Sequence, residues 1–378
     1  MIAAGETLGF NLVYVRHGHS HLMYFGWITP VLMAGFVALN RNLFSAASVK
    51  RVMIGVFIAA AASYPMFLFF GYSLRPIGSA EIPIAVIVSS LNMFAWYAFV
   101  AHYIRRTRGL ERTRSMLLFD VALTFLVLAT FGAWALALLQ PLGVESDAWT
   151  SALTHVFLDL FSEGWFVVGV LALMYGVARR PVSRRHPSLW MICAGLPLTF
   201  ALGMPRPLVP DELAMSARIG SLLVGAGLFW NVLLLWKQTP ERMPSWLWQF
   251  PLLMLGLKSL GQVAVGLTPG LWWTSIPGFR VLYLHLMLLG FASAAIIPLV
   301  TRIWDVRVGV SAGAFLGTIV LLLASLIPFT PMLPPEMFGR WVFIAAACVA
   351  PLPVAVALAM MMRELRSVTR RHAAEVSE

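Results

Sequence analysis

Histidines recur in this chain just before a glycine that is followed by an aromatic residue, at the start of long apolar runs. Three such segments occur, at positions 17–27, 155–165 and 283–291. When they are aligned on the glycine, His17 corresponds to His155 and His21 corresponds to His285. Imidazole is costly to place in hydrocarbon unless it has a partner, so repeated histidines of this kind indicate a metal or heme centre.

Helical geometry would divide these side chains between two faces. His17 and His21 are about 40° apart on a helix, whereas His19 lies about 200° from His17. One helix could therefore present imidazoles to two neighbouring pockets. Imidazole suits heme iron, copper or zinc, and a carboxylate suits non-heme iron or holds a liganding histidine in place. The candidate metal ligands are His17, His19, His21, His155, His285 and Asp159.

Other charged residues fall inside or at the ends of apolar runs. Glu163 and Lys258 lie near the middle of their runs, and two interpretations are equally open: a structural ion pair or part of a proton path. Arg16, Arg75 and Arg280 lie near the ends that carry the histidines. They could pair with heme propionates through charge-assisted hydrogen bonds, or they could contact lipid headgroups.

The composition is that of a membrane protein. The chain has 378 residues, of which 60% are hydrophobic and only 11% are charged, whereas soluble domains carry about 25% charged residues. Its continuous apolar runs predict an all-α, polytopic bundle that forms one integral membrane domain over residues 1–378, with the lipid bilayer as its surroundings. The net charge of +11 comes largely from loops, where arginine sets membrane orientation, so we predict no nucleic-acid partner.

Hydropathy predicts eleven membrane spans. They cover approximately 15–39, 52–71, 82–104, 116–139, 151–177, 188–203, 213–236, 247–267, 281–301, 309–328 and 341–362. The sixth is short and contains Gly195 and Pro197, so we expect it to be tilted, broken or partly re-entrant.

Basic residues alternate between the two sides of the predicted bundle. The arginine-rich loops, near 41–51, 105–114, 179–185, 237–242 and 302–307, fall on the side that carries a basic tail at 363–378. The positive-inside rule places this side in the cytoplasm, with the N-terminus outside. We therefore expect a multi-pass protein of the bacterial cytoplasmic membrane, with all three histidine segments near its outer face.

The three histidine segments open the first, fifth and ninth predicted spans. This spacing predicts parallel four-helix repeats at about 12–140, 150–270 and 278–365, in a pseudo-threefold arrangement. The third repeat is one helix short of a complete set, so the full pattern corresponds to eleven to twelve spans.

The segment from His19 to Trp27 resembles the His-x-His-x-x-x-x-Gly-Trp helix of heme–copper oxidase subunit I. An upstream Asn11 and Arg16, and a downstream Pro30, are also similar to an early heme-ligand helix of that family. That superfamily has twelve helices in three arcs of four. The NnrS-type heme–copper membrane proteins, which are linked to nitric oxide metabolism, share the same placement of histidines and are a close alternative.

The resemblance implies a low-spin b-type heme with His21 and His285 as axial ligands. It also implies that His19 or His17, together with His155, faces a second metal such as copper or non-heme iron. The chain departs from the oxidase pattern because the sixth span holds no histidine pair for a copper site and Tyr283 replaces one histidine of the ninth span.

Three hypotheses for function follow. The leading hypothesis is a heme-binding protein in electron transfer or in nitric oxide or oxygen handling, supplied by an electron-donor subunit or cytochrome. The second is a non-redox transporter or sensor for a metal or small molecule, with Asp159, Glu163 and Lys258 along its path. The third is an accessory heme or copper carrier that performs no turnover.

Overall fold

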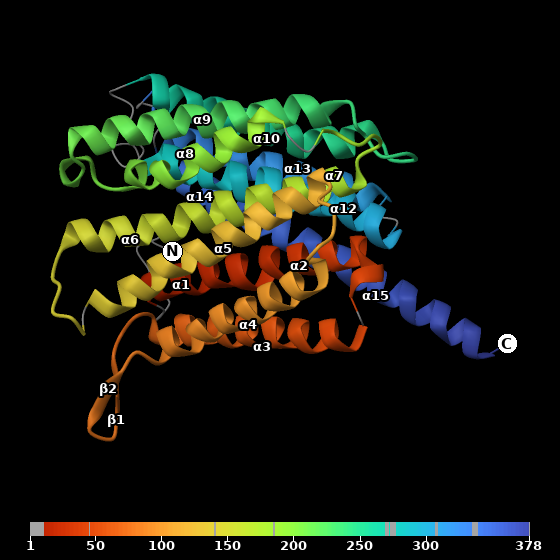
Figure 1. Cartoon of the computed structure of the whole chain (residues 1–378), viewed down its shortest axis with the longest axis horizontal. Coiled ribbons are helices and arrows are strands. Elements are labelled where there is room, and N and C mark those ends of the chain that lie inside the picture. Colours follow the sequence, from red (N-terminus) through yellow and green to blue (C-terminus); the bar gives the residue numbers. More distant parts are fainter. Residues whose placement is uncertain are drawn as a thin grey trace.

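The computed structural model describes residues 11–44, 46–139, 141–183, 186–268, 272, 277–306, 309–334 and 339–377. These residues are overwhelmingly helical, and the only strands among them form a short antiparallel hairpin, β1 (Arg75–Ile77) and β2 (Ala80–Ile82). Figure 1 shows long helices lying side by side in one bundle. A large hydrophobic core runs through it, with buried residues from the first span to α13, and a second, smaller cluster lies around Leu202, Val265 and Trp272.

The first half of the chain supplies five of the predicted spans. Its helices are α1 (Leu12–His21), η2 (Leu22–Ile28), α2 (Thr29–Leu39), η3 (Arg41–Leu43), α3 (Ala46–Phe70), α4 (Ile84–Thr107), α5 (Arg114–Leu139), α6 (Asp147–Asp159), η4 (Leu160–Val167) and α7 (Val168–Val177). The segments η2 and η4 are π-helical and continue directly into the α-helices on either side, so that each set of three forms one long span.

The second half supplies the remaining spans. Its helices are α8 (Pro187–Gly203), η5 (Arg206–Leu208), α9 (Asp211–Trp236), α10 (Ser245–Leu267), α11 (Pro277–His285), η7 (Leu286–Ser293), α12 (Ala294–Trp304), α13 (Gly309–Leu326), η8 (Ile327–Phe329), α14 (Arg340–Val349) and α15 (Leu352–Ser377). The segment η7 is a third π-helix, and it joins α11 to α12.

Ten helical stretches among the described residues are long and apolar enough to cross a membrane, and α8 is a shorter apolar helix. Each coincides with one of the eleven predicted spans, so the prediction of a multi-pass, all-α membrane protein is confirmed at this level. The outward faces of α3 and α4 expose large apolar side chains, including Phe57, Ile58 and Phe94, as a lipid-contacting surface requires.

Two spans need separate description. The sixth is one continuous helix, α8, which contains Pro197, so the expectation of a broken helix is wrong, and the expectation of a tilted or partly re-entrant one stays a prediction. The helix packs closely on α9, where a Cβ placed on Gly195 would come within 2.6 Å of the Gly220 carbonyl oxygen, so the glycine permits a close helix contact here. The eleventh is interrupted between α14 and α15. Pro351 explains this break, because proline lacks the N–H that continues a helix.

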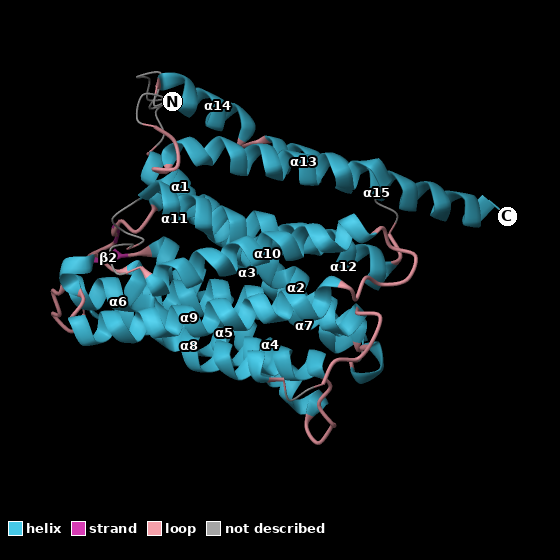
Figure 2. Cartoon of the chain, turned by 90° about the horizontal axis from the view of Figure 1, so that it is seen from above, coloured by secondary structure: helices cyan, strands magenta, loops and turns pink. Residues whose placement is uncertain are grey.

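The three helices that carry the histidine segments are central to the bundle. Their second halves, α2, α7 and α12, pack against one another pairwise. Their first halves turn to other neighbours: α1 packs on α3, α6 on α5 and α8, and α11 on α13. Figure 2 shows α1, α6 and α11 toward the same end of the bundle, which is called the histidine end below. The three helices therefore converge away from the histidines and separate near them.

Candidate functional site

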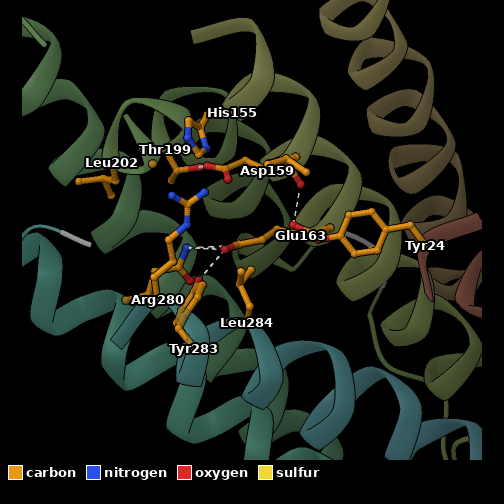
Figure 3. Close-up of a pocket in the computed structure, with 13 residues that line it drawn as sticks. Tyr24, His155, Asp159, Glu163, Thr199, Leu202, Arg280, Tyr283 and Leu284 are labelled. Carbon is orange, nitrogen blue, oxygen red and sulfur yellow. Dashed lines mark hydrogen bonds between the residues drawn. The ribbon is translucent and has the colours of Figure 1, made fainter. Parts of the chain in front are cut away.

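A small polar cavity lies at the histidine end, between α6, α8 and α11. Its volume is about 70 Å³, and residues from η2, η4 and α10 complete its wall. Figure 3 shows His155, Asp159 and Thr199 on one side of it, with Arg280 and Glu163 facing them. Most lining residues come from the second and third histidine segments and the helices packed beside them.

Glu163 is held by a complete set of hydrogen-bond donors. Its Oε2 accepts from Lys258 Nζ at 2.7 Å and from Gln262 Nε2 at 3.0 Å, and its Oε1 accepts from the Tyr283 hydroxyl at 2.5 Å. Lys258 also donates to Gln262 Oε1 at 2.7 Å. Lys258 is fully buried and Glu163 is 7% exposed. This is a buried, hydrogen-bonded ion pair, the arrangement in which opposite charges are tolerated in an apolar interior.

Asp159 lies one helical turn before Glu163 and has a much sparser set of partners. It accepts a hydrogen bond from the Thr199 hydroxyl at 3.1 Å, and it forms no ion pair with any described residue. Arg280, from α11, is close enough to interact electrostatically with Asp159, His155 and Tyr24. Its guanidinium points toward Asp159 and Thr199 (Figure 3).

His155 depends on a glycine for its position. A Cβ on Gly203, the last residue of α8, would lie 2.3 Å from His155 Nδ1. Any larger residue at 203 would therefore displace the imidazole. The absence of a side chain on α8 is what lets the His155 ring, which is 7% exposed, fit beside the cavity.

His21 faces away from this cavity, into the contact between α1, α3 and α4. Its ring stacks on Phe67 with a centroid distance of 3.7 Å and meets Phe25 edge-on at 4.8 Å. Its Nδ1 is 3.2 Å from the Ser89 hydroxyl. His17 lies on the same face and meets Tyr72 edge-on at 4.7 Å, as the helical spacing predicts.

His285 is anchored by its own helix. Its Nδ1 lies 2.8 Å from the Val281 carbonyl oxygen. Because a carbonyl only accepts, Nδ1 carries the proton and Nε2 keeps its lone pair, which is the form of imidazole that binds a metal. The histidine within electrostatic range of His285 is His19, on the opposite face of α1 from His21. The structure thus brings His19 toward His285, and it records no contact between His21 and His285.

The donor set can be compared with what each proposed group requires. No three His, Cys, Asp or Glu side chains among the described residues lie where they could hold one metal ion together. A multi-donor copper or iron site therefore does not fit the described arrangement. A heme iron requires only one imidazole on each face, and the anchored imidazoles of His21 and His285 fit that chemistry individually.

The predicted propionate partners are dispersed. Arg75 lies in the hairpin, with its guanidinium 5.3 Å from the centre of the Phe70 ring, and its Nε is buried without a hydrogen-bond partner among the described residues. Arg16 is exposed on α1. Arg280 alone of the three lines the cavity.

Sequence reasoning missed four residues of this site. Gln262, Tyr283, Thr199 and Tyr24 all line the cavity or bind its carboxylates. A signal existed for Gln262, since it lies four residues after Lys258 and so shares its helical face. Nothing in the local sequence marks Thr199, because its partner is 40 residues away.

Comparisons with protein-family models and with curated proteins find no match to this chain.

Proposed function

We propose that this chain is a heme-binding integral membrane protein of heme–copper-oxidase type, acting in electron transfer or in nitric oxide or oxygen handling. The bacterial cytoplasmic membrane and an electron-donor subunit or cytochrome are part of the same proposal. One observation carries it: all three histidine-segment helices contain a π-helical stretch at the same register. These stretches begin at Leu22, Leu160 and Leu286, immediately after His21, Asp159 and His285.

A π-helical stretch is uncommon and is frequently found at functional sites. Three in corresponding positions favour a common ancestral unit over three independent distortions. In the first, Thr29 Oγ1 donates to the Tyr24 carbonyl at 2.8 Å, next to Pro30, which has no N–H to offer. The local sequence thus stabilises the distortion in the first helix.

Helix packing also favours a threefold repeat. The fifth span packs on α5 and the ninth on α10, so that each follows the last helix of the preceding unit. Within units, α3 packs on α4 as α8 packs on α9 and as α13 packs on α15. These correspondences support the three-arc plan implied by the resemblance to heme–copper oxidases.

Within this proposal the chain's own residues orient and shield the group. Val281 fixes the His285 imidazole with Nε2 available, and Ser89 together with the Phe67 ring fixes the plane of His21. A bound heme with one imidazole on each face would supply a one-electron redox centre. The surrounding aromatic side chains would exclude water, which sets the local dielectric.

An absorption spectrum of the purified protein, oxidised and reduced, with metal analysis, tests the proposal. We expect a Soret band and bound iron. A purified protein with no Soret band, no iron and no copper would refute the heme proposal. His21→Ala and His285→Ala are each expected to abolish the low-spin signal. His102→Ala is the matched control, because His102 lies on α4 toward the opposite end, 3.3 Å from the Ser48 hydroxyl.

The His19→Ala variant decides which residue partners His285. Loss of the low-spin signal in His19→Ala, with retention in His21→Ala, would assign the ligand pair to His19 and His285. That result would keep the heme proposal and contradict the predicted ligand pair.

A second candidate function, a small-molecule transporter or sensor, is favoured by the cavity itself. Arg280 and Asp159 face a polar space that adjoins a fully buried Lys258–Glu163 pair. Intramembrane charges of this kind mark substrate or ion pathways by default. Uptake assays in proteoliposomes that lack heme would separate this function from the first, since the heme proposal requires no transport.

A further inference from the structure

The cavity at the histidine end is lined by acidic and basic side chains. Its volume of about 70 Å³ corresponds to about five water-sized positions. A ligand of about five non-hydrogen atoms would fill it, and neither a heme nor a large side chain would fit. The ligand is therefore small, and the charged groups around the cavity decide its chemistry.

Of the three charged side chains that line the cavity among the described residues, Glu163 is already neutralised by Lys258, which lies behind the cavity wall. Lys258 and Glu163 form an ion pair at 2.7 Å, and Gln262 and Tyr283 occupy further hydrogen-bonding positions of the carboxylate. This pair contributes no net charge to the cavity. It leaves few lone pairs or protons for a ligand.

Arg280 and Asp159 remain available. Neither is within 4.0 Å of an opposite charge among the described residues, yet the two interact electrostatically across the cavity. The Arg280 guanidinium presents a planar fork of donors that suits a carboxylate. Asp159 accepts one hydrogen bond from Thr199, and a carboxylate has capacity for several more.

These two side chains select the ligand class by their hydrogen-bonding chemistry. Arg280 presents only donors and Asp159 presents acceptor oxygens to the same space, so an anion alone would leave Asp159 without a charged partner and a cation alone would leave Arg280 without one. A zwitterion adds no net charge and satisfies both groups. Its carboxylate would meet Arg280, and its ammonium would meet Asp159.

We propose that this cavity is a binding site for a small zwitterion of the α-amino acid class, about the size of glycine. Arg280 binds the carboxylate, Asp159 binds the ammonium group, and the Thr199 hydroxyl orients Asp159. His155, Leu202 and Leu284 line the rest of the cavity, and its volume of about 70 Å³ sets the size of the ligand. This inference goes beyond the heme proposal and holds whether or not a heme is bound. It would supply the substrate class for the transporter or sensor alternative.

Calorimetric titration of the purified full-length protein in lipid nanodiscs tests the site with four probes. We expect one glycine molecule to bind to each protein chain. Acetate, which lacks the ammonium, and methylamine, which lacks the carboxylate, should each bind at least tenfold more weakly. Leucine should not bind, because its side chain exceeds the cavity. Equal affinity for acetate and glycine would overturn the proposal in favour of a simple anion site.

Charge-neutralising variants test the two contacts separately. Arg280→Gln and Asp159→Asn should each weaken glycine binding at least tenfold, and Arg280→Lys, which keeps the charge but loses the fork, should weaken it to a smaller degree. Arg16→Gln is the matched control, because Arg16 is exposed on α1 outside the cavity. Wild-type affinity in Arg280→Gln or Asp159→Asn would refute the assignment. An unchanged Soret band during the glycine titration is also required, since a shift would place the ligand at iron instead.

Discussion

Replacing only one residue of the buried Lys258–Glu163 ion pair should lower the free energy of unfolding far more than replacing both. In the Lys258→Met variant, Glu163 would keep its charge in an interior where it is 7% exposed. Breaking a buried pair in this way costs about 3–5 kcal/mol. Coulomb's law at the observed separation of 2.7 Å gives about 6 kcal/mol with an effective dielectric of about 20, which agrees in order of magnitude.

The double variant Lys258→Met with Glu163→Gln should recover most of this loss. The new amide oxygen can accept from the Tyr283 hydroxyl, and its N–H can donate to Gln262 Oε1 after the Gln262 amide rotates, so no buried charge is left unpaired. We expect the double variant to lie within about 2 kcal/mol of the wild type, and each single variant to lose about 3–5 kcal/mol. The coupling free energy should therefore be about 4 kcal/mol or more.

Thermal unfolding followed by intrinsic fluorescence, in one detergent at pH 7, provides the measurement. A loss of about 4 kcal/mol should lower the apparent melting temperature by about 5 °C for a chain of this length. The control is Asp211→Asn, which breaks an exposed pair with Arg206 and should cost less than about 1 kcal/mol. The prediction is contradicted if both single variants melt at the same temperature as the control, or if the double variant is no more stable than either single variant.

Two further predictions concern a glycine and a loop histidine. Gly203→Ala should lower the free energy of unfolding by about 1–3 kcal/mol in the same thermal scan, because the new Cβ would clash with the His155 ring. The control is Gly261→Ala, whose Cβ would have no atom within 4 Å; this variant should be neutral or more stable by up to about 1 kcal/mol. Equal losses in the two variants would contradict the prediction. His186 caps α8, its Nδ1 accepting from the Ser188 N–H at 3.3 Å, and burial followed by the charge of Arg114 lowers the pKa of His186 below its ordinary 6.5. Because the folded-state pKa is lowered, its contribution to stability should be present above pH 6.5 and be lost as the pH falls below that value. Asparagine also caps a helix but does not titrate. Between pH 7.5 and pH 5, the melting temperature of His186→Asn should therefore fall less than that of the wild type. An equal fall in both proteins would show that His186 is not the titrating group.

The spans were predictable because membrane insertion depends on a local quantity. About 20 consecutive apolar residues suffice to specify a crossing, and each of the eleven runs coincides with a helix in the structure. The interruption at Pro351 was also present in the sequence, as a residue that cannot continue a helix. The π-helical stretches were not, since an amphipathic pattern does not distinguish them from an ordinary α-helix.

The site was predictable only in part. Helical spacing alone separates His17 and His21 from His19, and the structure keeps them on different faces of α1. The sequence left a Lys258–Glu163 ion pair open as one of two interpretations, and the structure contains this pair. The sequence did not predict that Gln262 and Tyr283, 99 and 120 residues from Glu163, also donate to its carboxylate. The choice of His21 and His285 as one pair came from matching motifs, which indicates equivalent positions in a repeat but not a shared contact.

The sequence by itself therefore determined which segments form helices long and apolar enough to cross a membrane, because that property depends only on the residues along one helix. Only the tertiary structure decided which helices meet and which faces they turn to one another. In lipid every apolar helix is equally well solvated, so the lateral arrangement follows from close packing at small residues and from polar contacts between helices. The cavity with Arg280 and Asp159 exists because α2, α7 and α12 converge while α1, α6 and α11 separate.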